Sequence, residues 1–323
     1  MRENLILATA QGVEICEKTG SEWRLVRGGL TGNYITSLTV QAGVILAGTR
    51  QGIYRSTDLG VSWVNSSAGL EHPHIRWLAS HPQTPGVHLA GSEPAGIFIS
   101  QDGGETWHNQ PEVVQMRRQH HWSLPYSPEA GCVRGFAFHG NRVYAAVEVG
   151  GVLISDNSGG SWELAAGSPG SPLGSFNSRV DADVHSISVH PTSANLVSAP
   201  TGGGFYRSSD GGNSWQLLYR CYCRAVWVNP NDPAHMILGP ADYVDRNGRI
   251  EETRDGGQSW HPASPGLNVP WPRHMVERFH QAGDELFAVL SNGELLATPL
   301  TALSWRRILT EAHGVTAVTS LTP

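Results

Sequence analysis

The eight residues Ser208-Ser-Asp-Gly-Gly-Asn-Ser-Trp215 decide the fold, because four further copies of their pattern occur in the chain. The other copies are Ser56 to Trp63 (STDLGVSW), Ser100 to Trp107 (SQDGGETW), Ser155 to Trp162 (SDNSGGSW) and Thr253 to Trp260 (TRDGGQSW). Each has an aspartate, or Asn157 in the third copy, five residues before the tryptophan and a glycine three residues before it. In a tight turn such an Asx side chain accepts backbone N–H groups, and glycine accepts the positive φ that closes a hairpin. The repeat therefore predicts five similar hairpins, each followed by a buried tryptophan.

The tryptophans also count the structural units. Two weaker copies of the repeat end at Trp23 and Trp305, so that seven tryptophans follow one another at intervals of 40, 44, 55, 53, 45 and 45 residues. A loop and then a short apolar segment follow each of them, and we interpret these segments as innermost strands, at 35–40, 75–79, 133–138, 184–189, 223–228, 276–279 and 315–319. The sequence therefore predicts an all-β protein, a single seven-bladed β-propeller of four-stranded antiparallel blades that spans residues 1–323 as one domain.

The two ends of the chain are expected to share blade 7. The segment 313–323 has room for an inner strand alone, whereas about residues 1–27 supply three outer strands without an inner one. Pairing the N-terminal strands with the C-terminal innermost strand closes the ring and removes the open sheet edges that favour aggregation.

The repeat resembles the Asp-box, or BNR, repeat of sialidase-like propellers, and the resemblance covers about Ile35 to Trp260. Seven-bladed Asp-box propellers also occur in xyloglucanases and among the photosystem II assembly factors. The resemblance implies that the boxes lie on turns between third and fourth strands, on the face opposite the ligand. We therefore expect function at the other face, in the loops before the inner strands and in the hairpins between second and third strands.

The composition argues against two classes of partner. A formal net charge of −6 and a pI near 6.2 disfavour non-specific binding to nucleic acid or to an anionic membrane. No stretch approaches the ~18 apolar residues of a membrane span, and the N-terminal apolar run is too short for a secretory signal. We expect a cytoplasmic, monomeric protein with reduced thiols at Cys16, Cys132, Cys221 and Cys223.

The predicted inner strands share a polar position. Side chains at the second, fourth and sixth positions of a strand lie on one face. The fourth positions are apolar throughout: Leu38, Leu78, Phe136, Ile187, Val226, Phe279 and Val318. The second positions are polar throughout: Thr36, Arg76, Arg134, His185, Arg224, Glu277 and Thr316. We therefore predict a polar ring at the mouth of the central channel.

Three arginines in one ring require counter-charge, since two guanidiniums ~8 Å apart repel by about 2 kcal/mol. Glu277 is placed to neutralise Arg224, and Glu93 and Glu148 lie in hairpins of the blades that carry Arg76 and Arg134. The glutamates are either structural partners of the arginines, or the arginines hold a carboxylate, sulfate or phosphate through bidentate hydrogen bonds.

These residues favour a binding module as the first hypothesis. Its ligand is an anionic small molecule or an acidic peptide, held at the channel mouth by the polar ring and by aromatic residues of the adjacent loops. The candidate ligand-binding residues are Arg76, Arg134, His185, Arg224, Glu148, Glu93, Trp122 and Trp271.

The alternative is a glycan-active enzyme, either a glycoside hydrolase or a polysaccharide lyase. The resemblance to sialidases implies a tyrosine nucleophile with a glutamate partner and an aspartate acid. Tyr243 or Tyr126, paired with Glu277 or Glu148, and Asp183 or Asp242 are the candidates for these roles. The sialidase Phe-Arg-Ile-Pro segment is absent and sialidases normally have six blades, so the chain is not expected to be a sialidase.

A second alternative is a metal-binding propeller. His74, His121, His185 and His274 all fall in loops or strand ends at the expected mouth, and imidazole is a common ligand of zinc and copper. No two of them have a tight ligand spacing. A transition metal is thus the one cofactor for which the sequence offers ligands.

Overall fold

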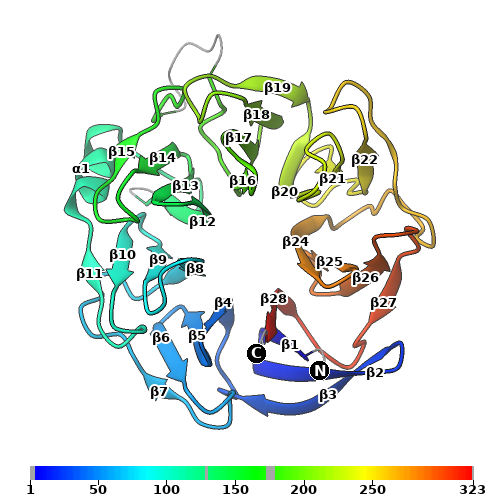
Figure 1. Cartoon of the computed structure of the whole chain (residues 1–323), viewed down its shortest axis with the longest axis horizontal. Coiled ribbons are helices and arrows are strands. Elements are labelled where there is room, and N and C mark those ends of the chain that lie inside the picture. The colour runs from blue at the N-terminus through cyan, green and yellow to red at the C-terminus, as the bar shows by residue number, and fades with distance from the viewer. Residues whose placement is uncertain (1–3, 128–129, 172–178, 322–323) are drawn as a thin grey trace.

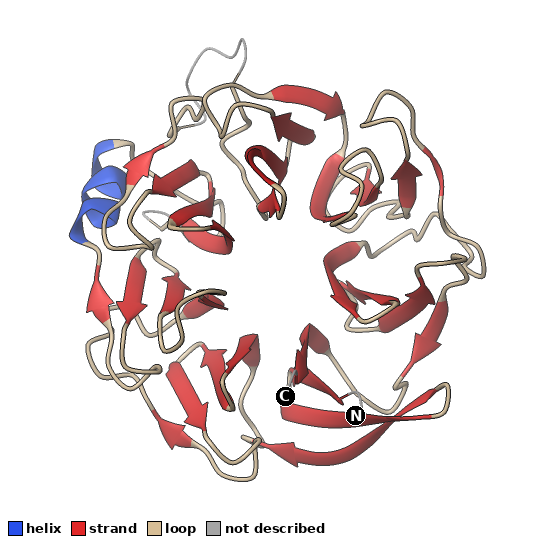
Figure 2. Cartoon of the chain, in the orientation of Figure 1, coloured by secondary structure: helices blue, strands red, loops and turns tan. Residues whose placement is uncertain are grey.

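The computed structural model describes residues 4–127, 130–171 and 179–321, which form seven four-stranded antiparallel sheets arranged as blades in a ring (Figures 1 and 2). The all-β prediction and the number of blades are therefore confirmed. Residues 1–3 and 322–323, at the two ends of the sequence and within the predicted shared blade, lie outside the described residues.

The first three blades follow one another in the chain. Blade 1 contains β4 (Ile35–Gln41), β5 (Val44–Thr49), β6 (Gly52–Ser56) and β7 (Val64–Asn65). Blade 2 contains β8 (Ile75–Ser80), β9 (His88–Ser92), β10 (Ile97–Ser100) and β11 (His108–Asn109). Blade 3 contains β12 (Cys132–His139), β13 (Arg142–Glu148), β14 (Gly151–Ser155) and β15 (Glu163–Leu164).

The next three blades repeat this order from the inside outward. Blade 4 contains β16 (Ser188–His190), β17 (Ser193–Pro200), β18 (Phe205–Ser208) and β19 (Gln216–Tyr219). Blade 5 contains β20 (Tyr222–Val228), β21 (Met236–Ala241), β22 (Glu251–Thr253) and β23 (His261–Pro262). Blade 6 contains β24 (Val276–Ala282), β25 (Glu285–Leu290), β26 (Leu295–Pro299) and β27 (Arg306–Ile308).

Blade 7 closes the ring from both ends of the chain. It contains β28 (Val315–Leu321), β1 (Asn4–Thr9), β2 (Gly12–Thr19) and β3 (Glu22–Gly29), in that order from the inside. β28 pairs with β1 in antiparallel register, with Leu7 opposite Val318 and Asn4 opposite Leu321, and the two strands lie side by side in Figure 1. The ring closure expected from the sequence is therefore confirmed.

The Asp-box turns join the third and fourth strands, as the resemblance implied. In the box of blade 2 the Asp102 carboxylate accepts hydrogen bonds from the Ser100 hydroxyl and from the backbone N–H groups of Glu105 and Thr106, the last two at 3.0 Å. The Trp107 side chain that follows is only 2 % exposed, and its indole N–H donates to the Ser66 carbonyl of blade 1 at 2.9 Å. Each box thus completes its own turn and sends a tryptophan into the interface between blades.

The inner strands share a bulge near their first residues, which the sequence pattern does not reveal. In β8, Ile75 pairs with Ser92 and Trp77 with Gly91, so Arg76 has no partner in the ladder. The same irregularity leaves a second-position residue unpaired in β4, β12, β20, β24 and β28. A β-bulge bends its strand and re-aims the side chain of the extra residue, here toward the ring axis.

Blade 4 departs from the predicted inner strand at 184–189. β16 begins only at Ser188, because the preceding residues turn on themselves, with the Asp181 carboxylate accepting the Asp183 N–H at 2.8 Å. Such local side-chain to backbone hydrogen bonds compete with strand pairing. His185 and Asp183 therefore lie on a compact loop rather than on a strand.

One helix lies outside the ring, between blades 2 and 3 (Figure 2). Helix α1 (Pro111–Gln119) falls in the long connection that the sequence left without predicted structure, and begins with proline at its first turn, where no N–H partner is needed. The Glu112 side chain accepts the Trp162 backbone N–H at 2.8 Å, which holds the helix against blade 3. In the described part of the chain, no helix has the length and apolar character needed to cross a membrane.

Candidate functional site

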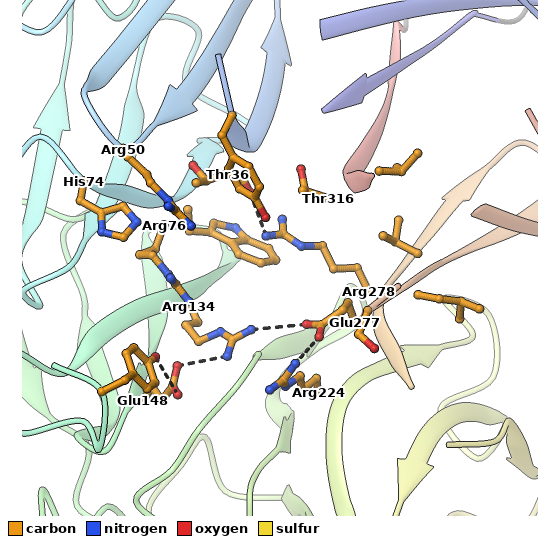
Figure 3. A pocket seen from close by; sticks show the side chains of 17 residues that line it. Thr36, Arg50, His74, Arg76, Arg134, Glu148, Arg224, Glu277, Arg278 and Thr316 are labelled. Atoms are coloured by element: carbon orange, nitrogen blue, oxygen red, sulfur yellow. Dashed lines mark hydrogen bonds and ion pairs between the residues drawn. The ribbon is translucent and has the colours of Figure 1, made fainter. Parts of the chain in front are cut away.

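A polar cavity of about 360 Å³ opens where the bulged starts of the inner strands meet (Figure 3). Because the Asp-box turns follow the third strands, they lie at the opposite ends of the blades. The residues that line the cavity and carry the argument are Thr36, Arg50, His74, Arg76, Trp77, Tyr126, Arg134, Glu148, Arg224, Glu277, Arg278 and Thr316. Six of the seven second-position residues therefore converge as predicted, whereas His185 does not line this cavity.

The two threonines of the ring have a structural role. The Thr316 hydroxyl donates to the Ile35 carbonyl, and the Thr36 hydroxyl donates to the Ile75 carbonyl, both at 2.6 Å. Each bond joins one inner strand to the next blade. These side chains satisfy carbonyl groups near the bulges and contribute no charge.

The predicted ion pairs around the arginines are confirmed. Arg76 contacts Glu93 at 3.2 Å and Arg134 contacts Glu148 at 3.1 Å, each within its own blade. Glu277 bridges two blades, since it pairs with Arg224 and lies 3.6 Å from the Arg134 guanidinium. These pairs cross-link blades 3, 5 and 6 at the channel mouth, as the dashed lines of Figure 3 show.

Ion pairing keeps the carboxylates charged. Burial by itself would raise the pKa of Glu148, but Arg134 and His185 outweigh it and lower that pKa to about 2. Burial likewise opposes ionisation of Glu277, yet Arg224 and Arg134 keep its pKa below the usual range. Neither group is therefore a proton donor at neutral pH, which weighs against general acid catalysis by either.

Arg278 is a fourth arginine of the cavity wall that the sequence analysis missed. Its guanidinium reaches across the channel from blade 6, lies 4.1 Å from the centre of the Trp77 ring, and donates to the Thr36 carbonyl at 3.0 Å. No carboxylate of the described residues lies within ion-pairing distance of it. Burial lowers the pKa of Arg278 to about 9, with Arg134 and Arg76 acting in the same direction and Glu277 opposing them. It remains a cation at neutral pH, without an ion-pair partner in the part of the chain that the structure describes.

The sequence-based prediction missed Arg278 and Trp77 because it assumed strict alternation of side chains along each inner strand. Both occupy third positions, which a regular strand turns away from the face that carries the second and fourth residues. The register shift between Val276 and Arg278, and between Ile75 and Trp77, breaks this alternation, and both side chains line the cavity. The one sequence feature that could have indicated Arg278 is its charge, because an arginine is unusual at a position that the predicted inner strand turns toward a buried face.

Arg50 adds a fifth guanidinium at the rim. It is exposed, and its guanidinium carbon lies 4.8 Å from the centre of the Tyr34 ring. The mouth thus gathers five arginines, at positions 50, 76, 134, 224 and 278, against three glutamates, at positions 93, 148 and 277. The excess of positive charge is local, in a protein whose net charge is −6.

A second cavity, of about 710 Å³, adjoins the first and shares Tyr126, Glu148 and Arg224 with it. Besides Arg179 and several small or apolar residues, its further walls carry two carboxylates and three phenol groups: Asp181, Asp183, Tyr206, Tyr222 and Tyr243. Burial raises the pKa of Asp181, and the charge of Asp183 adds to this effect. Two adjoining cavities of opposite character therefore occupy this face, one rich in arginine and the other in carboxylate and phenol groups.

The candidate catalytic residues are only partly brought together. The Tyr126 hydroxyl donates to Glu148 at 3.3 Å, which reproduces a tyrosine–glutamate pair, but burial raises the pKa of Tyr126 and disfavours the phenolate. Tyr243 is 64 % exposed at the rim. Asp242 binds Asn247 at 2.9 Å and Arg249 at 3.1 Å within its own hairpin. Asp242 therefore stabilises a turn, contrary to the role of proton donor considered for it.

Trp122 and Trp271 do not form a ligand platform, which corrects the sequence-based prediction. Trp122 is 1 % exposed, and its indole N–H donates to the Gly170 carbonyl at 2.7 Å. Trp271 is 5 % exposed and stacks on His274, with ring centroids 5.1 Å apart. Both rings pack in the core because the loops that carry them fold back onto blades 3 and 6.

The four histidines do not converge, so the expectation of a histidine cluster was wrong. His74 lies 3.9 Å from Glu93, while His274 packs against Trp271 in another blade. Among the described residues, one group of potential metal ligands lies together, and it contains His185 with Glu148 and Asp183. The loops that carry His74, His121 and His274 belong to separate blades, and the spacing of residues along the chain does not show how far apart those loops lie.

The family comparison agrees with the motif and the ring. The model of the BNR/Asp-box repeat matches residues 98–109, which contain the box of blade 2. The chain is a seven-bladed propeller with BNR/Asp-box repeats. No curated protein sequence is detectably similar to this propeller.

Solved structures resemble the propeller in fold, at low sequence identity. An ancestral GH74 enzyme superposes with a TM-score of 0.60 at 19 % identity, over 89 % of this chain and 38 % of that one, so the propeller spans well under half of that enzyme. YCF48 bound to D1 peptide gives a TM-score of 0.60 at 15 % identity and covers 96 % of both chains. Sqt1 of Chaetomium thermophilum, bound to the N-terminus of ribosomal protein L10, gives 0.54 at 14 % identity, over 96 % of this chain and 85 % of Sqt1. These similarities concern the fold.

Proposed function

We propose that this propeller binds an anionic ligand at the mouth of its channel, through guanidinium groups that its own carboxylates do not neutralise. The observation that carries the proposal is Arg278, a cation in the cavity wall with an aromatic ring and a carbonyl as neighbours but, in the described chain, no carboxylate within ion-pairing distance. A carboxylate or phosphate group in the cavity of about 360 Å³ would supply the missing negative charge.

The paired arginines support this ligand by their positions. Arg76 and Arg134 are held by Glu93 and Glu148, so their guanidiniums are fixed before a ligand arrives. Such preorganisation reduces the entropy lost on binding. The structural and the ligand-binding interpretations of the arginines are therefore compatible, with the glutamates orienting groups that an anion would contact.

The ligand is either a small anion or the acidic end of a peptide. Two propellers of similar fold, YCF48 and Sqt1, hold a peptide or a protein terminus in their structures, which supports the peptide form of the proposal. The exposed Arg50 and Tyr243 at the rim would be available to residues that follow the anionic group.

The enzyme alternative receives less support from the geometry. Its best observation is the carboxylate and phenol cavity beside the mouth, together with the fold shared with a GH74 enzyme. Against it, Glu148 and Glu277 are committed to ion pairs, and Tyr126 is disfavoured as a phenolate. Asp181 and Asp183 are the carboxylates of this cavity that no arginine or lysine of the described chain neutralises.

Replacing Arg278 tests the proposal. Arg278→Met removes the unpaired charge but keeps an unbranched side chain over Trp77, so the fold should be retained. We expect citrate, phosphate or a peptide with an acidic C-terminus to stabilise the wild type against heating at low salt. Calorimetry should show that the variant binds these anions 10- to 100-fold more weakly. One charged hydrogen-bond partner contributes about 1.5–3 kcal/mol, which corresponds to this loss of affinity.

Arg142→Met is the matched control, since Arg142 pairs with Asp156 at the Asp-box end of blade 3. It should bind these anions as the wild type does. Absence of binding of all three probes by the wild type, or equal binding by wild type and Arg278→Met, would show that the mouth arginines have a purely structural role.

A further inference from the structure

The loop before β16 and the end of β13 place three potential metal ligands together, at the boundary between the arginine cavity and the cavity beside it. The ligand atoms of His185, Asp183 and Glu148 all lie within 4.8 Å of one another. His185 and Asp183 come from blade 4 and Glu148 from blade 3, so the group joins neighbouring blades.

Hydrogen bonding determines which nitrogen of His185 is free. The His185 side chain is fully buried, and its Nδ1 lies 2.9 Å from the Cys223 carbonyl oxygen, which can only accept a hydrogen bond. Nδ1 therefore carries the proton. This arrangement, with one ring nitrogen donating to a carbonyl, is the one that orients the other nitrogen of a histidine toward a metal.

The other nitrogen faces a carboxylate. His185 Nε2 lies 3.2 Å from Asp183 Oδ2 and 3.3 Å from the Tyr222 hydroxyl. The Tyr222 hydroxyl can donate to the lone pair of Nε2, but the negatively charged Asp183 Oδ2 faces the same nitrogen. A proton or a metal ion between Nε2 and Oδ2 removes that repulsion.

The two carboxylates have unused acceptor capacity on the same side. Asp183 Oδ1 is buried with no hydrogen-bond partner in the described chain, and His185 is the one basic side chain within ion-pairing distance of Asp183 there. Glu148 binds Arg134 and the Cys132 thiol through Oε2, so that the Tyr126 hydroxyl, at 3.3 Å, is the one hydrogen-bond partner of Oε1 among the described residues. Gly202 packs against the Asp183 carboxylate where a Cβ would not fit, which holds that carboxylate in place.

We propose that His185 Nε2, Asp183 and Glu148 Oε1 bind a divalent transition metal ion such as Zn²⁺. One imidazole nitrogen and two carboxylate oxygens are ligands that Zn²⁺ accepts, at about 2.0–2.2 Å. The separation of 3.2 Å between His185 Nε2 and Asp183 already fits two ligands of one ion, and Glu148, which lies within 4.8 Å of both, must move closer to complete the set. Asp183 is 34 % exposed to the cavity of about 710 Å³, which leaves the fourth position open to water or to a ligand.

Metal titration of untagged protein tests the site. After chelator treatment and dialysis, calorimetry with ZnCl₂ should show one equivalent bound, and CoCl₂ should give visible d–d absorption bands of the bound ion. Asp183→Asn keeps the shape of the side chain but removes its charge, and we expect it to weaken Zn²⁺ binding at least tenfold. Circular dichroism would show whether the variant is folded.

Asp181→Asn is the matched control, because Asp181 lies in the same loop and the same cavity but outside the group of three ligands. The Zn²⁺ affinity of Asp181→Asn should be within about threefold of that of the wild type. Arg278→Met should still bind the metal even if it no longer binds the anion, so each proposal can be contradicted without the other. Less than about one tenth equivalent of metal on the wild type, or equal Zn²⁺ affinity of wild type and Asp183→Asn, would overturn the metal site and leave an imidazolium as the cation.

Discussion

The charged side chains at the two faces of the propeller, the Asp-box end and the channel mouth, find their partners in different ways. At the Asp-box end, Asp102 receives hydrogen bonds from Ser100, Glu105 and Thr106, all within four residues of it. At the channel mouth, Glu277 serves Arg224 and Arg134, which come from two other blades. The Asp102 carboxylate is therefore satisfied within its own turn, whereas Glu277 meets its partners only when the ring is closed.

This difference distinguishes polar groups that only stabilise the fold from polar groups that are able to bind a ligand. A carboxylate whose hydrogen bonds are all supplied by its own turn offers nothing to a ligand, so the boxes are strong markers of fold and weak markers of function. Over the described residues, the mouth instead retains Arg278 without a carboxylate in ion-pairing distance and the Asp183 Oδ1 atom without a hydrogen-bond donor. Unsatisfied groups of this kind are where a partner can contribute binding free energy.

The largest expected effect comes from removing a carboxylate at the mouth. Glu277→Gln leaves Arg224 and Arg134 without their shared partner, and breaking a buried pair in this way costs about 3 kcal/mol. Urea unfolding followed by tryptophan fluorescence would measure the loss, and added citrate should recover more stability in the variant than in the wild type. Glu105→Gln is the control, because Glu105 is an exposed partner of Arg55 and should change stability by less than about 1 kcal/mol. Equal losses in the two variants would contradict the difference drawn between the two ends.

A smaller effect is expected from breaking one Asp-box. Asp102→Ala removes the acceptor for two backbone N–H groups and two hydroxyls of a single turn, and such capping losses cost about 1–2 kcal/mol. The same urea experiment measures the change. Anion binding at the mouth should stay within twofold of the wild type, and a larger change would mean that the two ends are coupled through blade 2.

The smallest effect is expected from an amide in the same position. Asn157 already fills it in blade 3, where it accepts the Ser161 N–H and donates to the Ser161 hydroxyl, both at 2.9 Å. Asp102→Asn should therefore change the free energy of unfolding by no more than about 0.5 kcal/mol at pH 7.

Measuring the unfolding of wild type and Asp102→Asn at acidic pH makes this comparison more sensitive. Burial is the largest single influence on the pKa of Asp102 and raises it, but the hydrogen bonds from Thr106, Ser100 and Glu105 together outweigh burial and hold that pKa well below its usual range. The stabilisation by ionised Asp102 is thus present above its ordinary pKa near 4 and is lost as the pH falls below that value. The amide does not titrate, so the variant should lose less stability than the wild type between pH 4 and pH 2. Parallel unfolding profiles over that range would rule out this contribution of Asp102.

Local rules predicted most of the fold and part of the site. The Asp-box turns and the tryptophans predict blades because each turn depends on a few adjacent residues. The pairing of Arg76 with Glu93 and of Arg134 with Glu148 was also predictable, since both partners lie in one blade. Trp122 and Trp271 were assigned to the mouth from loop position alone, and the structure buries both because packing, not position in the chain, determines exposure.

By itself, the sequence determined the number of blades, the closure of the ring and the polar residues at its axis, because these follow from a repeated local pattern. Only the tertiary structure decided which charges remain unpaired. A bulge in β24 turned Arg278 across the channel to Trp77, and a compact loop brought Asp183 and His185 to Glu148 of the next blade. Both events join side chains from different blades, and a distance between blades depends on the packing of the whole ring rather than on residues near in sequence.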